Sequence, residues 1–135
     1  MSNGGNGEDP LRELLVDAAE VDRRQIATTL KGRVGIDSKT GRLQLLPGYN
    51  QLDARRKVLA VLLARKAAFL LEITDDDALT NKEVTEITGL AAGTAAPSLK
   101  SLRELRLVSQ GDGKAYFIPN AHLLDVIRFI AGEGQ

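Results

Sequence analysis

Apolar residues recur every three or four positions along six segments of this 135-residue chain. That period is typical of α-helices that bury one face and leave the other face in water. The longest such segment has a broad face of leucine, isoleucine and phenylalanine side chains, as a central core helix would. The sequence therefore predicts helices at about residues 10–20, 23–30, 51–73, 81–88, 95–105 and 121–131.

Two other segments alternate between apolar and polar residues, which is the period of a β-strand. Residues 33–46 alternate on both sides of a turn, where Gly41 suits a left-handed backbone conformation. Residues 107–109 and 115–118 flank a second, glycine-rich turn. The predicted fold class is therefore mainly α with small β-hairpins, an α+β arrangement.

Helix-end signals support this division of the chain. Thr80 and Glu83 have the spacing of a capping box, and Gly89 is a typical stop. Thr94 is a predicted N-cap, with Pro97 in the first turn of the helix that follows, where proline is tolerated. The other predicted helix ends are marked by Asp9, Pro10, Gly32, Asn120 and Gly132.

The same periodicity predicts which side chains point outward. In the helix after Thr94, the core stripe is Leu99, Leu102 and Leu105. The outward side chains of that helix are then Ser98, Lys100, Ser101, Arg103 and Arg106. On the long helix, the cations expected to point outward are Arg55, Arg56, Lys57, Arg65 and Lys66.

Charge is unevenly distributed along a chain whose net charge is zero. Residues 1–22 carry a balance of −5, residues 23–66 of +9, residues 67–88 of −5, and residues 89–135 of only +1. A basic block within a neutral chain is compatible with phosphate contact. It is equally compatible with a solvated surface that acidic neighbours neutralise, and the sequence leaves both interpretations open.

Composition excludes several kinds of chemistry. The chain has no cysteine, so it can form no disulfide and no thiolate metal site. Its one histidine excludes a His-rich metal site. Aromatic residues make up only 4%, too few for the stacking platforms of single-strand binders. Asp75, Asp76 and Asp77 lack further ligands and are expected to form a solvated loop. No catalytic constellation is present, so the sequence predicts neither an enzyme nor a cofactor.

The N-terminal residues MSNGGNGEDP lack the basic start and apolar run of a secretory signal. Residues 58–71 are apolar but too short and too charged to span a bilayer. We therefore expect a cytoplasmic protein without a membrane partner. The expected organisation is a disordered tail at residues 1–8, a helix and hairpin extension at 9–50, and a main domain at 51–135.

The run TGLAAGTAAPSLKSLRELRLVSQGDGKAYFIPN resembles the winged helix-turn-helix transcriptional regulators of bacteria and archaea. The resemblance covers about residues 51–131. It implies double-stranded DNA binding, with a recognition helix in the major groove and a wing on the backbone. We also expect a homodimer through the first and last predicted helices, because each has an apolar stripe that a single winged-helix core would not fully cover. The expected DNA-binding residues are Arg55, Arg56, Lys57, Thr94, Ser98, Lys100, Ser101, Arg103, Arg106 and Lys114.

Two features depart from a strong DNA binder of that family. The balance of only +1 over residues 89–135 weakens the expected affinity, because non-specific binding scales with the phosphates neutralised. Arg106 replaces the usual glycine before Leu107 and Val108, which is expected at most to lengthen the helix by one residue. The alternative is a winged helix that serves as a protein–protein assembly module and binds no DNA.

Overall fold

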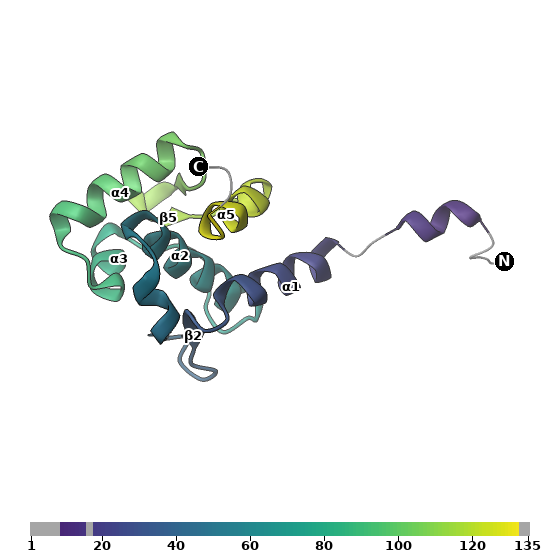
Figure 1. The fold of residues 1–135 in the computed structure, drawn as a ribbon, viewed down its shortest axis with the longest axis horizontal. Helices are drawn as coiled ribbons and strands as arrows, with labels where there is room; N and C mark the ends of the chain where they lie inside the picture. The colour runs from purple at the N-terminus through teal and green to yellow at the C-terminus, as the bar shows by residue number, and fades with distance from the viewer. Residues whose placement is uncertain (1–8, 16–17, 133–135) are drawn as a thin grey trace.

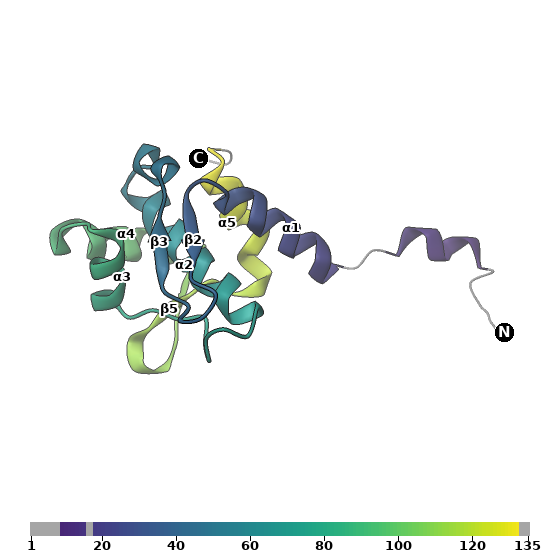
Figure 2. The same cartoon turned by 90° about the horizontal axis from the view of Figure 1, so that it is seen from below.

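The computed structural model describes residues 9–15 and 18–132, so the predicted tail at residues 1–8 lies outside the described part. The described chain is mainly helical with two small antiparallel hairpins, which confirms the predicted α+β class. Helix α2 lies at the centre, with α3 and α4 on one side and α1 on the other (Figures 1 and 2). The α-helices are α1 (Ala18–Leu30), α2 (Ala54–Leu70), α3 (Asn81–Thr88), α4 (Ala92–Glu104) and α5 (Leu123–Ile130).

Both predicted hairpins are present. In the first, β2 (Val34–Ile36) pairs with β3 (Leu43–Leu45), and Gly41 in the turn has the expected positive φ of +77°. In the second, β4 (Ser109–Gln110) pairs with β5 (Tyr116–Phe117), and Leu79 forms a further antiparallel bridge with Tyr116. Four 3-10 helices complete the described elements: η1 (Pro10–Leu14), η2 (Pro47–Gln51), η3 (Asp112–Lys114) and η4 (Asn120–His122).

The second hairpin has shorter strands than predicted. Leu107 and Val108 precede β4 and make no strand pairing, and both side chains are buried. Tyr116 is buried and Phe117 is half-buried, so Tyr116 is the member of this aromatic pair that packs on the core. The loop of this hairpin is therefore short and is closed by two pairs of strand residues.

Helix α2 is buried on all sides over its middle turns. Residues 58–64 have no exposed surface, as expected of a helix that lies inside a core. Helices α1, α3, α4 and α5 and both strands of the first hairpin contact it. The hydrophobic core consequently runs from Ile26 to Ile130 and includes residues of both the N-terminal extension and the main domain.

The N-terminal helices differ from the prediction. Instead of helices at 10–20 and 23–30, the structure has the 3-10 turn η1 and one continuous helix, α1. The end signals were correct: Asp9 accepts a hydrogen bond from the Leu11 N–H at 2.9 Å, Pro10 opens η1, and Gly32 follows α1 with φ of +77°. No other element packs on η1 in the described chain, and short helices are marginal without such packing.

Helix α4 begins earlier than predicted. Its N-cap is Ala91, which has no side-chain acceptor, so Thr94 lies inside the helix rather than at its cap. Pro97 accordingly lies in the second turn and not in the first. Leu105 is 49% exposed and not part of the core, because the helix ends at Glu104 and the chain turns away there.

The end of α4 explains the missing glycine. Arg106 adopts a left-handed conformation with φ of +62°, and the Leu107 N–H donates to the Leu102 carbonyl at 3.0 Å. This is the position after a helix at which glycine is usual. Arg106 therefore ends the helix as a glycine would, and the predicted one-residue extension does not occur.

A left-handed arginine carries backbone strain of about 1 kcal/mol that glycine avoids. Arg106→Gly is expected to raise the free energy of unfolding by up to about 1 kcal/mol relative to Arg106→Ala, which removes the same side chain and keeps the strain. Urea unfolding of both variants measures the difference. Equal stability of the two variants would show that the turn is not strained.

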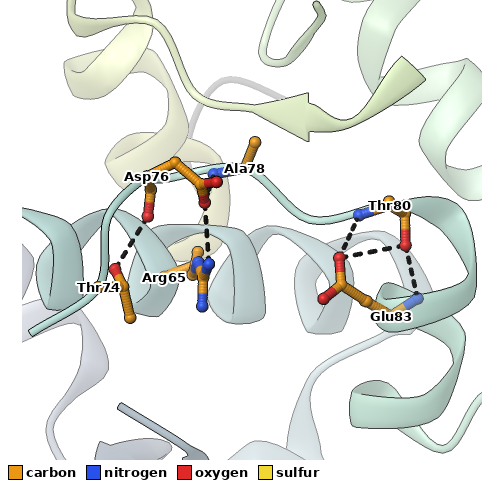
Figure 3. Close-up of polar contacts among 6 residues, drawn as sticks. All are labelled: Arg65, Thr74, Asp76, Ala78, Thr80 and Glu83. Carbon is orange, nitrogen blue, oxygen red and sulfur yellow. Dashed lines mark hydrogen bonds and ion pairs between the residues drawn. The ribbon is translucent and has the colours of Figure 1, made fainter. Parts of the chain in front are cut away.

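The acidic loop is anchored and not merely solvated. Asp76 accepts a hydrogen bond from Arg65 at 2.8 Å, and its carboxylate also receives the Ala78 N–H at 3.3 Å (Figure 3). The bond from Arg65 holds the pKa of the Asp76 carboxyl below its ordinary value. Lys66 is buried, against the prediction, and its Nζ donates to the Ile118 carbonyl at 2.9 Å, with an Asp77 oxygen at 3.6 Å.

The C-terminal helix also starts later than predicted. Asn120 opens the 3-10 turn η4, and α5 follows from Leu123. Gly132 has φ of +89° just after the helix, as expected of a stop residue.

Across residues 9–15 and 18–132, no helix combines the length and apolar character needed to cross a membrane.

Candidate nucleic-acid interface

Helices α3 and α4 pack on each other across a short turn, and both pack on α2. Gly89 ends α3 with φ of +75°. The buried Tyr49 hydroxyl donates to the Thr88 carbonyl at 3.1 Å and so anchors the last turn of α3. Burial raises the pKa of Tyr49 from 10.0 to about 12, and the hydroxyl is a protonated donor at physiological pH with either value.

The predicted capping box of α3 is present. A Glu83 side-chain oxygen accepts from the Thr80 N–H at 2.9 Å, and the Glu83 N–H donates to the Thr80 hydroxyl at 3.1 Å (Figure 3). A carboxylate therefore occupies the N-terminal end of α3. The N–H groups of Thr80 and Glu83 are therefore already bonded within the capping box and are not available to a phosphate.

One exposed ridge of α4, which we call the outward ridge, runs through Gly93, Pro97, Lys100 and Glu104, at spacings of four, three and four residues. The first two have no side-chain hydrogen-bonding group. Only Lys100 and Glu104 on this ridge can donate to or accept from a base edge. The first half of the ridge is therefore suited to close approach and poorly suited to reading sequence.

Arg103 connects α4 to the second hairpin. Its guanidinium donates to the Gln110 side-chain oxygen, and the Gln110 amide donates to the Lys114 carbonyl at 3.1 Å. We call this chain of two hydrogen bonds the Arg103–Gln110 brace. It fixes the hairpin loop relative to the helix. Sequence reasoning missed Gln110, whose position four residues before Lys114 across a tight turn was the available signal.

Four exposed cations share the surface formed by α4 and the hairpin loop. Lys100 and Arg103 lie one turn apart on the helix, Arg106 lies just beyond its end, and Lys114 lies in the loop that the brace holds. We call these four residues the basic face. The structure thus leaves four predicted site residues exposed on α4, just after it, or in the loop that the brace joins to it: Lys100, Arg103, Arg106 and Lys114.

Other predicted site residues of α4 are less available. Ser98 is 7% exposed, and its hydroxyl donates to the Thr94 carbonyl at 2.8 Å, so its predicted outward orientation is wrong. Ser101 is half-buried and lies 3.4 Å from an Arg55 nitrogen that donates to it. Thr94 is exposed, inside the first turn of α4.

Arg56 was also expected to point outward and is instead 8% exposed. Its guanidinium pairs with Asp53, donates to the Phe129 carbonyl at 2.8 Å and stacks 4.6 Å from the centre of the Phe129 ring. These contacts tie the start of α2 to α5. Arg56 is therefore a structural residue, and a DNA contact would require it to leave a buried site.

Arg55 and Lys57 are both half-buried. The Arg55 guanidinium lies 5.2 Å from the centre of the Phe129 ring, and the Lys57 ammonium lies 5.5 Å from that of Tyr49. Both charged groups therefore lie over aromatic rings of the core. Arg55 is the nearer of the two to α4, through its bond to Ser101.

The basic block at residues 23–66 does not form one surface. Helix α1 lies on the opposite side of α2 from α3 and α4 in both views (Figures 1 and 2), so its cations lie far from the basic face. Arg23 of α1 donates to the Leu70 carbonyl at 2.9 Å. With Arg56 and Lys66 buried, the block divides between structural contacts and separate solvated patches.

The two surfaces predicted to form a dimer differ in the structure. The leucines at residues 11–15, which form the apolar stripe of the first predicted helix, are exposed. Helix α5 contacts α1 and α2, and Leu123 and Ile130 are buried, whereas Leu124 stays 45% exposed. The monomer core therefore covers much of the C-terminal stripe and leaves the N-terminal stripe uncovered.

The described residues contain no cluster of three or more histidine, cysteine, aspartate or glutamate side chains that could hold a metal ion. Comparison of the chain with protein-family models, with curated proteins and with solved structures found no match in any of the three.

Proposed function

We propose that this protein is a winged helix-turn-helix protein that binds double-stranded DNA, with α4 in the major groove and the loop of the second hairpin as its wing. The observation that carries the proposal is the basic face, in which the Arg103–Gln110 brace holds Lys114 beside the cations of α4. The order of α2, the Leu79 bridge, α3, α4 and the second hairpin supports the fold assignment.

The proposed contact is mainly to the phosphate backbone. Lys100, Arg103, Arg106 and Lys114 are all exposed cations, whereas the first half of the outward ridge lacks hydrogen-bonding side chains. Phosphate contacts position a protein on DNA and carry no sequence information, while base contacts specify the site. We therefore expect measurable affinity for generic duplex DNA and weak discrimination between sequences.

Salt dependence tests this function. If the four cations each neutralise one phosphate, the logarithm of the binding constant should fall with the logarithm of the salt concentration at a slope of about −3.6. Fluorescence anisotropy with two unrelated duplexes of equal length, titrated at several salt concentrations, measures the slope and the specificity together. No binding to either duplex at low salt would rule the proposal out.

The second candidate is a protein-docking module that uses the same face. It is favoured by Glu104 on the outward ridge and by Leu105, an apolar side chain that is 49% exposed beside it. A DNA-binding surface gains nothing from either residue. In the salt titration, a flat, weak response to both duplexes would favour this candidate over the first.

A further inference from the structure

An apolar groove lies between α1, strand β2 and the C-terminal end of α2. Its volume is about 450 Å³, and its walls include Ile26, Leu30, Val34, Leu70 and Leu71. Leu71 is 56% exposed there. This groove faces away from α4, because α1 and α4 lie on opposite sides of α2 (Figure 1). The groove is therefore not part of the basic face.

Residues 9–15 form a second apolar feature, which we call the N-terminal arm. Leu11, Leu14 and Leu15 are 67%, 76% and 66% exposed, the three most exposed large apolar side chains described. In both views the arm projects beyond the first turn of α1 and away from the body of the protein (Figures 1 and 2). Three neighbouring exposed leucines on a projecting segment are typical of an interaction site.

The arm is short enough to fit the groove, and its net charge is opposite to that of the groove cations. Arg23 of α1 and Lys31, just after α1, line the groove eight residues apart, which corresponds to about 12 Å of helix. The leucines of the arm span about 8 Å in a 3-10 helix. The arm carries Asp9, Arg12 and Glu13, a balance of −1, and Arg23 and Lys31 place cations at the groove. Apolar burial and opposite charges therefore favour the same pairing.

We propose that the N-terminal arm of one copy of this chain docks into the apolar groove of a second copy, and that reciprocal exchange of two arms forms a homodimer. Reciprocal exchange gives two identical contacts related by a twofold axis and leaves no unpaired groove. The basic faces of both copies stay free, since they lie on the other side of α2.

The short connection to α1 favours docking between copies over docking within one copy. Three residues of chain from Leu15 to Ala18 span at most about 10 Å. Folding back along α1 uses nearly all of that length to cross the 8–10 Å between packed helices. The arm would then end near Arg23 and would not reach Leu30 at the other end of the groove.

Single-cysteine variants test the pairing directly, since the natural chain has no cysteine. Arg12→Cys marks the arm and Ala27→Cys marks the groove, and both positions are exposed. An equal mixture of the two full-length variants, treated with a short bis-maleimide, is expected to give a covalent dimer. Arg12→Cys mixed with Leu124→Cys is the matched control, because Leu124 is exposed on α5 outside the groove, and should give little product.

Sedimentation without DNA measures the dimer itself. Leu11→Glu with Leu14→Glu is expected to weaken dimerisation at least about tenfold, while Leu124→Glu leaves it unchanged. The arm variant should unfold at the same urea concentration as the natural chain when both are monomeric, because neither leucine belongs to the monomer core. These measurements are independent of DNA binding, so either proposal can fail alone.

Three results would overturn the pairing. One is a natural chain that remains monomeric at all concentrations tested. Another is a dimer that Leu11→Glu with Leu14→Glu does not weaken. The third is a double variant, Arg12→Cys with Ala27→Cys, that cross-links only within one chain, which would place the arm in its own groove.

Discussion

Replacing Lys66 with alanine is expected to lower the free energy of unfolding by about 3 kcal/mol. The lysine is 4% exposed, and its Nζ donates to the Ile118 carbonyl at 2.9 Å. Alanine would leave that carbonyl without its donor and would open a cavity where the four-carbon stem now packs. Asp77 would also lose the cation that lies 3.6 Å away. Urea unfolding followed by circular dichroism measures the loss.

Arg65 provides the matched control for Lys66. It is the preceding residue of α2 and also pairs with the acidic loop, through Asp76, but its pair is exposed to solvent. Exposed ion pairs contribute about 0–1 kcal/mol, so Arg65→Ala should cost far less than Lys66→Ala. Lys66→Met, which keeps most of the stem, should fall between the two. Equal losses for Arg65→Ala and Lys66→Ala would show that the buried ammonium is not important for stability.

The burial of Lys66 illustrates what periodicity cannot predict. Its partner carbonyl lies 52 residues away in the sequence, and the Phe129 carbonyl that binds Arg56 lies 73 residues away. A helical pattern shows that both cations sit among apolar neighbours, and it favours an outward orientation because isolated buried charges are costly. Only the positions of the distant carbonyls, which depend on the whole fold, make burial acceptable.

The elements that were predicted well depend on neighbouring residues. The capping box of Thr80 and Glu83, the stop at Gly89 and the turn at Gly41 are all local hydrogen-bond or backbone requirements. The start of α4 was predicted wrongly for a related reason. Thr94 is a strong local cap signal, but the N-cap of α4 is Ala91, three residues before it, which offers no signal of its own.

The mistaken orientation of Ser98 has a geometric cause. The predicted core stripe of Leu99, Leu102 and Leu105 extends past Glu104, where α4 ends. It leaves Ser98 on the predicted outward face. The buried side chains are Ala95, Ser98, Leu99 and Leu102, in which a small serine lies between apolar neighbours. Its hydroxyl can be buried because it donates to the carbonyl of Thr94 within the same helix.

Charge reversal of the basic face is expected to abolish most DNA binding. The variant replaces Lys100, Arg106 and Lys114 with glutamate and keeps Arg103, so the Arg103–Gln110 brace stays in place. All three residues are exposed, so the fold should tolerate the change. Unchanged circular dichroism and thermal unfolding would confirm that any loss of binding is not a loss of structure.

The expected loss of affinity for generic duplex DNA is at least about 100-fold at low salt, because three phosphate contacts are removed and three repulsive charges are added. The magnitude of the salt slope should decrease from about 3.6 to about 1 or below, since only Arg103 remains. The matched control replaces Lys39, Arg42 and Arg128 with glutamate. These residues are equally exposed and give the same change in net charge outside α3, α4 and the second hairpin. An equal loss in this control would mean that net charge, and not the basic face, governs binding.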